Sequence, residues 1–131
     1  MFVAVLVSAA ACQSPIGTDD GRVAVGPWGG DHIRMDVVPG GATLEYDCAH
    51  GTIDEPIVPD SGGRFSAGGT HTFEHGGPTR IDEPENRHQA RYNGRVVGDT
   101  LEITVTVIDT RQRLGTFMLT FRHAARIVKC L

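Results

Sequence analysis

Six histidines are the residues of this 131-residue sequence whose side chains are best suited to chemistry. His71 and His75 lie four residues apart, the spacing at which two histidines on one face of a helix bind zinc. Glycine pairs on both sides, at 68–69 and 76–77, argue against a helix. On a strand the two imidazoles would be about 13 Å apart, too far to share one ion. We therefore expect surface or hydrogen-bonded histidines, with His71 on the strand face of Phe65 and able to point inward.

A second arrangement would join histidines from distant parts of the chain. His32 stands beside Asp31, and His50 lies three residues after Asp47, so these side chains together with His71 form a candidate mononuclear metal site. Sequence spacing alone does not bring them together. We therefore predict no metal ion and no other cofactor.

The sequence contains no recognised catalytic motif. Gly-x-Ser-x-Gly, a phosphate-binding glycine loop and His-Glu-x-x-His are all missing. Glu45 and Asp47 share a strand face, but that face is expected to point to solvent, whereas a general acid and base need a cleft that shifts their pKa values. The formal charge of −4 argues against a nucleic-acid binder. We predict a protein that is not an enzyme and that binds no nucleic acid.

The clearest structural signal is a hairpin between residues 100 and 121. From Leu101 to Val107 apolar and polar residues alternate, which predicts a strand with one buried face. A polar turn follows at 109–113, and alternation returns from Gly115 to Phe121. An isolated hairpin cannot bury its apolar face. The rest of the chain must therefore cover it.

Further strands are predicted where the same alternation runs between turns rich in glycine or proline, at 31–38, 42–48, 64–73, 89–97 and 125–131, with a short one at 51–53. The glycine pair inside 64–73 predicts a bulge or a bend. Seven or eight antiparallel strands with short connections favour closure, because a closed sheet has no free edges. We predict an all-β, lipocalin-like up-and-down barrel over residues 27–131. A β-sandwich is the alternative.

Inward-facing residues of these strands would line any cavity of the barrel. Trp28 lies beside glycines just before the first expected strand, which is typical of a residue that plugs the floor of a small barrel. The residues predicted to line a ligand cavity are Trp28, Tyr46, Phe65, Tyr92, Ile103, Val105 and Phe117.

The N-terminus contains an apolar run that resembles a targeting signal. Residues 1–11 contain an apolar run that is shorter than the roughly 20 residues a membrane-spanning helix needs. The run is similar to a secretory signal, and Ala9-Ala10-Ala11-Cys12 resembles a bacterial lipobox. Trp-Gly-Gly at 28–30 and Asp-Cys-Ala-His-Gly at 47–51 also resemble bacterial lipoproteins known only as sequences. This resemblance implies a lipid on Cys12, a flexible tether over 12–26, and a membrane-anchored location in the cell envelope, in the periplasm or at the outer membrane.

The remaining cysteines fit an exported protein. With Cys12 lipidated, Cys48 and Cys130 form an even pair in a compartment where disulfides persist. A bridge between them would close most of the domain, which the chain-entropy model values at about 4–5 kcal/mol. We predict this disulfide, with Cys48 on the inward face of its strand beside Tyr46.

Two functional classes remain. The main prediction is a binding module that holds a small apolar ligand inside the barrel. The alternative is a filled barrel that binds a protein partner through the loops at 49–61 and 75–86. Its shape would resemble that of small bacterial lipoprotein barrels, which include periplasmic protease inhibitors. The interior volume of the barrel distinguishes the two classes.

Overall fold

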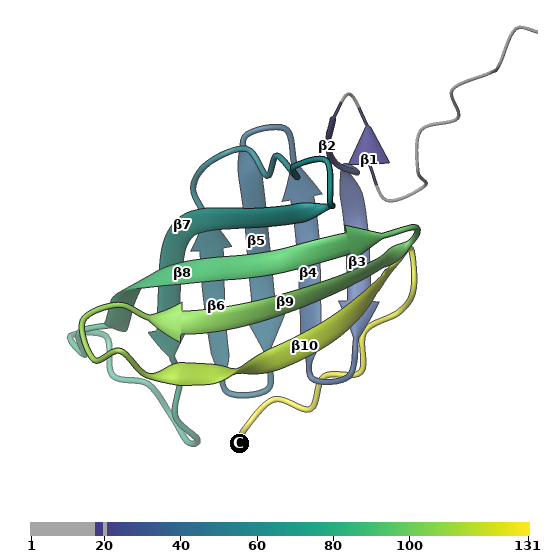
Figure 1. Ribbon diagram of the computed structural model, residues 1–131. Coiled ribbons are helices and arrows are strands. Elements are labelled where there is room, and N and C mark those ends of the chain that lie inside the picture. The colour runs from purple at the N-terminus through teal and green to yellow at the C-terminus, as the bar shows by residue number, and fades with distance from the viewer. Residues whose placement is uncertain (1–17, 20) are drawn as a thin grey trace, which may run out of the picture.

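The computed structural model describes residues 18–19 and 21–131, and all regular secondary structure in these residues is β. Eight strands form one closed antiparallel barrel, in which each strand pairs with its neighbours in the chain and the last pairs with the first (Figure 1). The predicted up-and-down barrel is therefore confirmed, and the sandwich alternative is wrong. The barrel strands are β3 (Gly26–Gly30), β4 (Ile33–Val38), β5 (Gly41–Tyr46), β6 (Ala49–Ile53), β7 (Arg64–Phe73), β8 (Asn86–Val97), β9 (Thr100–Val107) and β10 (Arg113–Phe121).

The β9–β10 hairpin follows the predicted alternation. Leu101 pairs with Leu119, and Ile103 pairs with Phe117. Burial of an aliphatic side chain of this size stabilises a fold by about 1.5–3 kcal/mol. The inward residues of β9, all 0% exposed, are Leu101, Ile103, Val105 and Val107.

The barrel closes through β3, a strand that the sequence analysis did not predict. Trp28 of β3 pairs with Phe121 of β10. A Cβ atom at Gly30 would lie 2.0 Å from the carbonyl oxygen of Met118, so only glycine lets the two strands approach this closely. The glycines beside Trp28, which the sequence analysis placed before the first expected strand, belong to a strand themselves and permit closure.

The C-terminal segment, predicted as a strand at 125–131, is not one. β10 already pairs with β9 on one side and with β3 on the other, so the closed barrel offers it no free edge. The segment runs across the end of the barrel near β3 and β4 (Figure 1). It is held there by a single parallel bridge between Asp31 and Arg126 and by the amide of Arg126, which donates to the carbonyl of Gly30 at 3.0 Å.

β7 bends sharply along its length (Figure 1). Its pairing with β8 runs without a register shift from Arg64 to Phe73, so the glycine pair makes a bend and not a bulge. A Cβ atom at Gly69 would lie 1.7 Å from the carbonyl oxygen of Thr52, whereas at Gly68 the nearest atom would be 4.0 Å away. Gly69 therefore allows the close approach of β6 and β7 at the bend.

The folded part of the chain begins before residue 27. Val23 and Ala24 are buried, and the indole nitrogen of Trp28 donates to the carbonyl of Ala24 at 3.0 Å. Two short strands, β1 (Thr18–Asp19) and β2 (Arg22–Val23), pair with each other outside the barrel. The expected tether over 12–26 thus includes residues that pack on the barrel. The signal-like segment 1–11 and Cys12 lie outside the described residues.

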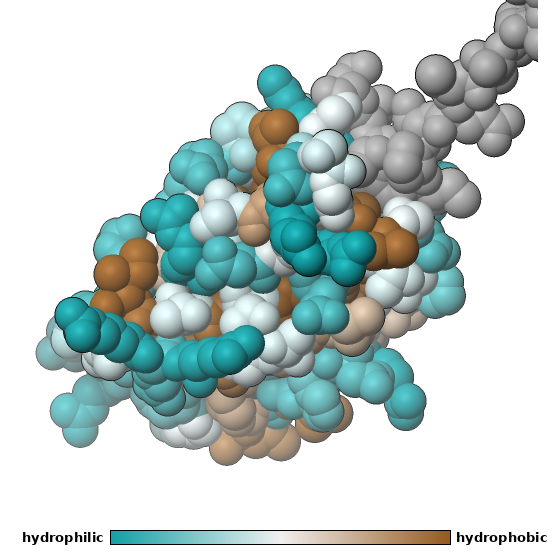
Figure 2. All heavy atoms as spheres, viewed as in Figure 1, coloured by the Kyte–Doolittle hydropathy of each residue, from teal (hydrophilic) through white to brown (hydrophobic). Residues whose placement is uncertain are grey.

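Side chains fill most of the barrel interior. Large residues from several strands, among them Trp28, Tyr92, Ile103 and Leu119, are at most 1% exposed. The outer face over β8, β9 and β10 is mostly hydrophilic or neutral, and its hydrophobic atoms lie in separate places (Figure 2). Apolar groups are therefore concentrated inside the barrel, as expected for a single small core. None of the residues that the structure describes forms a helix long and apolar enough to cross a membrane.

Candidate ligand-binding cleft

An apolar cleft of about 260 Å³ opens at the end of the barrel where β5 ends and β6 begins. We call it the end cleft. β10 supplies its far wall, and the turn between β5 and β6 supplies part of its rim. The residues that line it are His32, Tyr46, Asp47, Cys48, Ala49, His71, Phe73, Leu114 and Phe117.

Five aromatic rings form a chain of contacts, and the first four of them line the end cleft while the fifth, His88, lies behind it. The ring centre of Tyr46 lies 5.3 Å from that of Phe117 and 5.2 Å from that of His71. His71 is 4.7 Å from Phe73, which is 5.5 Å from His88. The ring planes of each pair are tilted by 58° to 76°, close to the edge-to-face geometry that aromatic pairs prefer. The rings come from four strands, so only the closed barrel assembles them.

His71 is an enclosed histidine on the cleft wall. It is 4% exposed, and its Nδ1 has no hydrogen-bond partner. The alternation of β7 turns it inward, so it is neither the surface histidine nor, at Nδ1, the hydrogen-bonded one that the sequence analysis expected. Burial lowers the pKa of His71 to about 4, with smaller contributions from His50 and His88. The imidazole is therefore neutral at pH 7, and it adds polarity without charge to the cleft.

Tyr46 is a second buried polar residue on the same wall. It is 6% exposed, and its hydroxyl has no hydrogen-bond partner. Burial raises the pKa of Tyr46 well above its ordinary value, and the nearby Tyr92 raises it further. Tyr92 itself donates to the carbonyl of Thr70. A buried polar group without a partner costs about 1–3 kcal/mol. Such groups are rare in folded proteins, and two of them border one cleft here.

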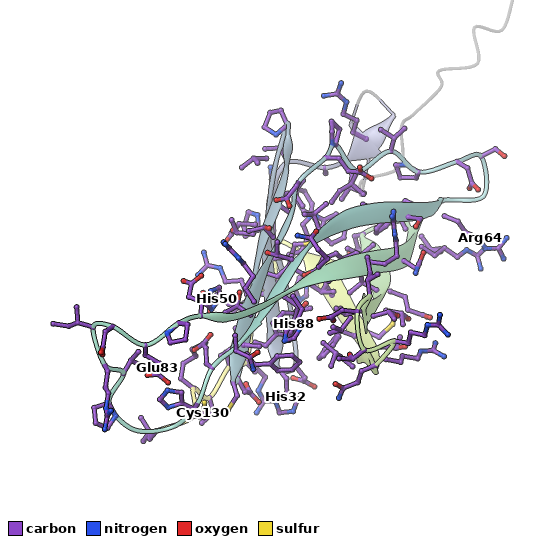
Figure 3. All side chains as sticks on the ribbon, turned by 90° about the vertical axis from the view of Figure 1, so that its left-hand side faces the viewer. His32, His50, Arg64, Glu83, His88 and Cys130 are labelled. Carbon is purple, nitrogen blue, oxygen red and sulfur yellow. The ribbon has the colours of Figure 1, made fainter. Side chains whose placement is uncertain are left out.

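The rim of the end cleft carries two histidine–carboxylate pairs. Nδ1 of His32 lies 2.6 Å from the carboxylate of Asp47, and Nδ1 of His50 lies 3.0 Å from that of Glu74. A hydrogen bond from the backbone of Val128 lowers the pKa of Asp47, and His32 lowers it further. Figure 3 shows His32 at the lower end of the barrel near Cys130, far from Arg64.

Lys129 ties the C-terminal segment to this rim. Its Nζ donates to the carboxylate of Glu45 and to the carbonyl of Tyr46, both at 2.9 Å, and to Glu74 at 3.1 Å. Arg34 stands opposite Glu45 in the β4–β5 register but pairs with Asp36 instead, at 3.1 Å. The charges at this end are therefore largely neutralised by one another.

Cys48 and Cys130 lie side by side at the same rim as free thiols. The amide of Cys130 donates to the carbonyl of Asp47 at 3.1 Å, and hydrogen bonding with the Cys130 thiol is the main cause that raises the pKa of Cys48. Cys48 is exposed rather than inward, because β5 ends at Tyr46 and the chain turns there. The predicted disulfide is not formed in this structure, although its two partners are adjacent.

Two of the residues predicted to line a cavity, Tyr46 and Phe117, line the end cleft. The other five do not, because an eight-stranded barrel is only just wide enough for its own side chains. Trp28, for example, packs against Phe121 at 5.0 Å instead of forming the floor of a cavity. The predicted lining residues that belong to the packed core, at 0–7% exposure, are Trp28, Phe65, Tyr92, Ile103 and Val105.

The sequence analysis missed Phe73 and Leu114 as cleft residues. Phe73 shares a strand with His71 and ends β7, so alternation together with its terminal position could have indicated it. Leu114 had no such signal. The register of β10 against β9 shifts between Arg113 and Gly115, and this bulge sets the direction of Leu114.

His32, His50 and His71 do not form the metal site considered from the sequence. The first two bind carboxylates, and the third has no ligating neighbour at its Nδ1. Within residues 18–19 and 21–131, no three side chains of the His, Cys, Asp or Glu type are arranged to hold a metal ion.

A second hollow, of about 300 Å³, lies at the opposite end of the barrel beside β2. Val25, Val38 and Ile57 contribute to its wall, which contains no aromatic ring. Neither of the two buried polar atoms without a partner borders it. The end cleft is therefore the better candidate for a binding site.

No match was found. Comparisons with protein-family models, with curated proteins and with solved structures each gave no similar protein. The geometry and chemistry of the end cleft are therefore the basis for inferring what this protein does.

Proposed function

We propose that this protein is an exported, non-enzymatic binding module that holds a small apolar ligand in the end cleft. One observation carries the proposal: aromatic and aliphatic side chains surround a neutral, buried imidazole, that of His71, whose Nδ1 has no partner. Ligand sites typically combine a mainly apolar lining with a few placed polar groups.

The volume of the end cleft limits the ligand to a small molecule. Ligand pockets usually measure about 300–1,000 Å³, and the end cleft, at about 260 Å³, lies just below that range. The core beneath it is packed, and its residues Tyr92 and Ile103 are 0% exposed. The ligand would therefore lie at the mouth of the barrel and not inside it.

The ionisable groups around the end cleft favour binding over catalysis. A general acid or base works best when its pKa lies near the working pH. The pKa of Tyr46 is raised and that of His71 is lowered to about 4, so both are neutral and far from titration at pH 7. The nearest carboxylates, those of Asp47 and Glu74, are held in ion pairs.

Export with a lipid on Cys12 belongs to the same proposal. The lipobox-like residues 9–12 support it, and so does the adjacency of Cys48 and Cys130, which an oxidising compartment would convert into a bridge. Mass spectrometry of the mature protein from bacterial membranes tests the anchor. We expect a lipidated Cys12 as the first residue, and an unmodified Cys12 would contradict the anchor.

A filled barrel that binds a protein partner is the second candidate. The packed interior favours it, as do exposed apolar residues in two loops. Val58 is 58% exposed in the loop after β6, and Ile81 is fully exposed in the loop between β7 and β8. This candidate predicts that substitutions in the loops, and not in the end cleft, abolish function.

A binding titration tests the main proposal. We expect an apolar fluorescent dye such as N-phenyl-1-naphthylamine to bind the purified protein with a stoichiometry of one. Phe117→Glu should abolish binding because it places a charge in the cleft wall. Met118→Glu is the matched control. Met118 is the next residue along β10, its side chain is 53% exposed, and it lies outside the end cleft. Equal binding by both variants, with circular dichroism showing that both are folded, would place the dye elsewhere and overturn the proposal.

A further inference from the structure

We propose that the end cleft selects a neutral aromatic molecule that carries one hydrogen-bonding group, of the phenol or indole type. This inference rests on the proposed function and names the class of ligand that the same cleft takes.

The first argument is the composition of the wall. Phe117, Tyr46, His71 and Phe73 are successive members of one ring chain, and all four line the end cleft. Because successive rings are tilted rather than parallel, the wall presents both ring edges and ring faces. A flat ring can continue this edge-to-face pattern with two or more of these residues, which adds to the gain from burial alone. A saturated molecule of the same size gains burial only.

The second argument is the missing hydrogen bond. His71 is 4% exposed, lines the end cleft, and has an Nδ1 without a partner. A half-turn of the imidazole about its Cβ–Cγ bond keeps the outline of the ring and exchanges Nδ1 with Cδ2. In the proposed complex a hydroxyl or N–H group on the ligand would pair with this nitrogen and remove the cost of the unpaired atom.

The third argument concerns charge. The basic side chains at the rim, His32 and Lys129, are already bound to carboxylates, and the carboxylate of Asp47 is bound in turn. No unpaired charge among the residues that line the end cleft is therefore available to hold an anion or a cation. A neutral ligand suits a wall that is apolar and uncharged.

Three compounds of similar size separate these contributions. In p-cresol an aromatic ring carries a hydroxyl, toluene has the ring alone, and 4-methylcyclohexanol has the hydroxyl alone. Binding is measured by proton NMR titration, with ligand contacts to Leu114 and Phe117 confirming the site. We expect p-cresol to bind most tightly, and each of the others to bind about threefold to tenfold more weakly.

Two variants assign the hydrogen bond. His71→Phe should remove the preference for p-cresol over toluene while toluene binding persists. His88→Phe is the matched control, because His88 belongs to the ring chain but does not line the end cleft. We expect it to keep the preference.

The outcomes distinguish this inference from the proposed function. Equal binding of p-cresol and 4-methylcyclohexanol in the end cleft would overturn selection of aromatic ligands and leave a binding module for apolar molecules. Equal binding of p-cresol and toluene by the wild-type protein would overturn the role of His71. Absence of binding by all three compounds and by the dye would overturn the proposed function as well.

Discussion

The carboxylate of Asp47 accepts a hydrogen bond of 3.0 Å from the backbone amide of Val128, which joins the end of β5 to the C-terminal segment. The backbone carbonyl of Asp47 also accepts from the amide of Cys130 at 3.1 Å. Asp47 thus holds Val128 and Cys130 against the rim of the end cleft. Residues 125–131 are secured by these contacts, by the backbone bridge of Arg126 and by Lys129, and not by a sheet.

Asp47→Ala should loosen the C-terminal segment without unfolding the barrel. Loss of one charge-assisted hydrogen bond should speed amide exchange at Val128 by about tenfold. NMR-detected hydrogen exchange measures this rate. Asp36→Ala is the control, because Asp36 pairs only with Arg34 on the barrel surface. The same exchange rate at Val128 in both variants would contradict the assignment.

The same bond should weaken in acid. The hydrogen bond from Val128 lowers the pKa of Asp47 in the folded protein. A carboxyl with a lowered folded pKa contributes stability above its unfolded pKa of about 3.9 and loses that contribution as the pH falls through the folded value. Exchange at Val128 should therefore stay slow, relative to intrinsic rates, until the pH is below about 4. Release of the segment near pH 6 would show that another group controls it.

Oxidation should join Cys48 and Cys130 without rearranging the fold, because their thiols already interact. The chain-entropy model predicts a gain of about 4–5 kcal/mol in the free energy of unfolding for a loop of this length. Free-thiol counting and denaturant unfolding of oxidised and reduced protein measure both effects. Cys130→Ser serves as the control that cannot form the bridge. Two free thiols in protein taken from an oxidising compartment would contradict the prediction.

His71 should make the fold less stable in mild acid. Its folded pKa of about 4 lies below an unfolded value of about 6.5, so the unfolded chain takes up the proton first. The contribution of His71 to the free energy of unfolding is therefore complete above pH 6.5. It declines as the pH falls toward 4, by about 2–4 kcal/mol in all. His71→Phe should lack this decline. Parallel stability curves for wild type and variant over this range would contradict the prediction.

Wild type must be compared with His71→Phe because His75 changes the stability of the fold with pH in the opposite direction to His71. The carbonyl of Gly76, together with Glu83, raises the pKa of His75. A raised folded pKa adds stability below the unfolded value of about 6.5, and this is lost as the pH rises through the folded value. His75 makes this contribution in wild type and in His71→Phe alike. It therefore cancels when the stability of one protein is subtracted from that of the other.

Gly69→Ala should be much more damaging than Gly68→Ala, although the two residues are adjacent. A Cβ atom at Gly69 would meet the carbonyl oxygen of Thr52 at 1.7 Å, whereas the nearest atom to a Cβ at Gly68 is 4.0 Å away. Forcing β6 and β7 apart should cost about 1–3 kcal/mol or more. The Gly68 variant should remain within about 0.5 kcal/mol of wild type. Equal loss of stability in chemical denaturation would contradict this account of the bend.

Local alternation predicted most of the barrel because it reports which face of a strand is buried. The faces of 31–38, 64–73 and 101–107 followed it, and His71 turned inward as the face of Phe65 required. Alternation could not identify β3, since Gly26–Gly30 contains one large apolar residue and no periodic pattern. Nor could it show that 125–131 has no strand to pair with.

The residues of the end cleft were likewise predicted only in part from the sequence. Tyr46 and Phe117 were predicted from their inward positions, but Trp28, Tyr92 and Ile103 have equally inward positions and lie in the packed core. Distance from the barrel end decides which inward residue meets solvent, and that distance depends on the register between strands. The bulge that turns Leu114 toward the cleft is likewise a property of the β9–β10 pairing.

The sequence by itself determined seven of the eight barrel strands, most of their buried faces and the all-β class, because a period of two is a local property of neighbouring residues. Only the tertiary structure decided that β3 closes the barrel and that rings from β5, β7 and β10 line one cleft. The physical reason is that these contacts depend on how strands far apart in the chain align. The packing of the whole core selects the register between these strands, and no short stretch of sequence is sufficient to predict that register.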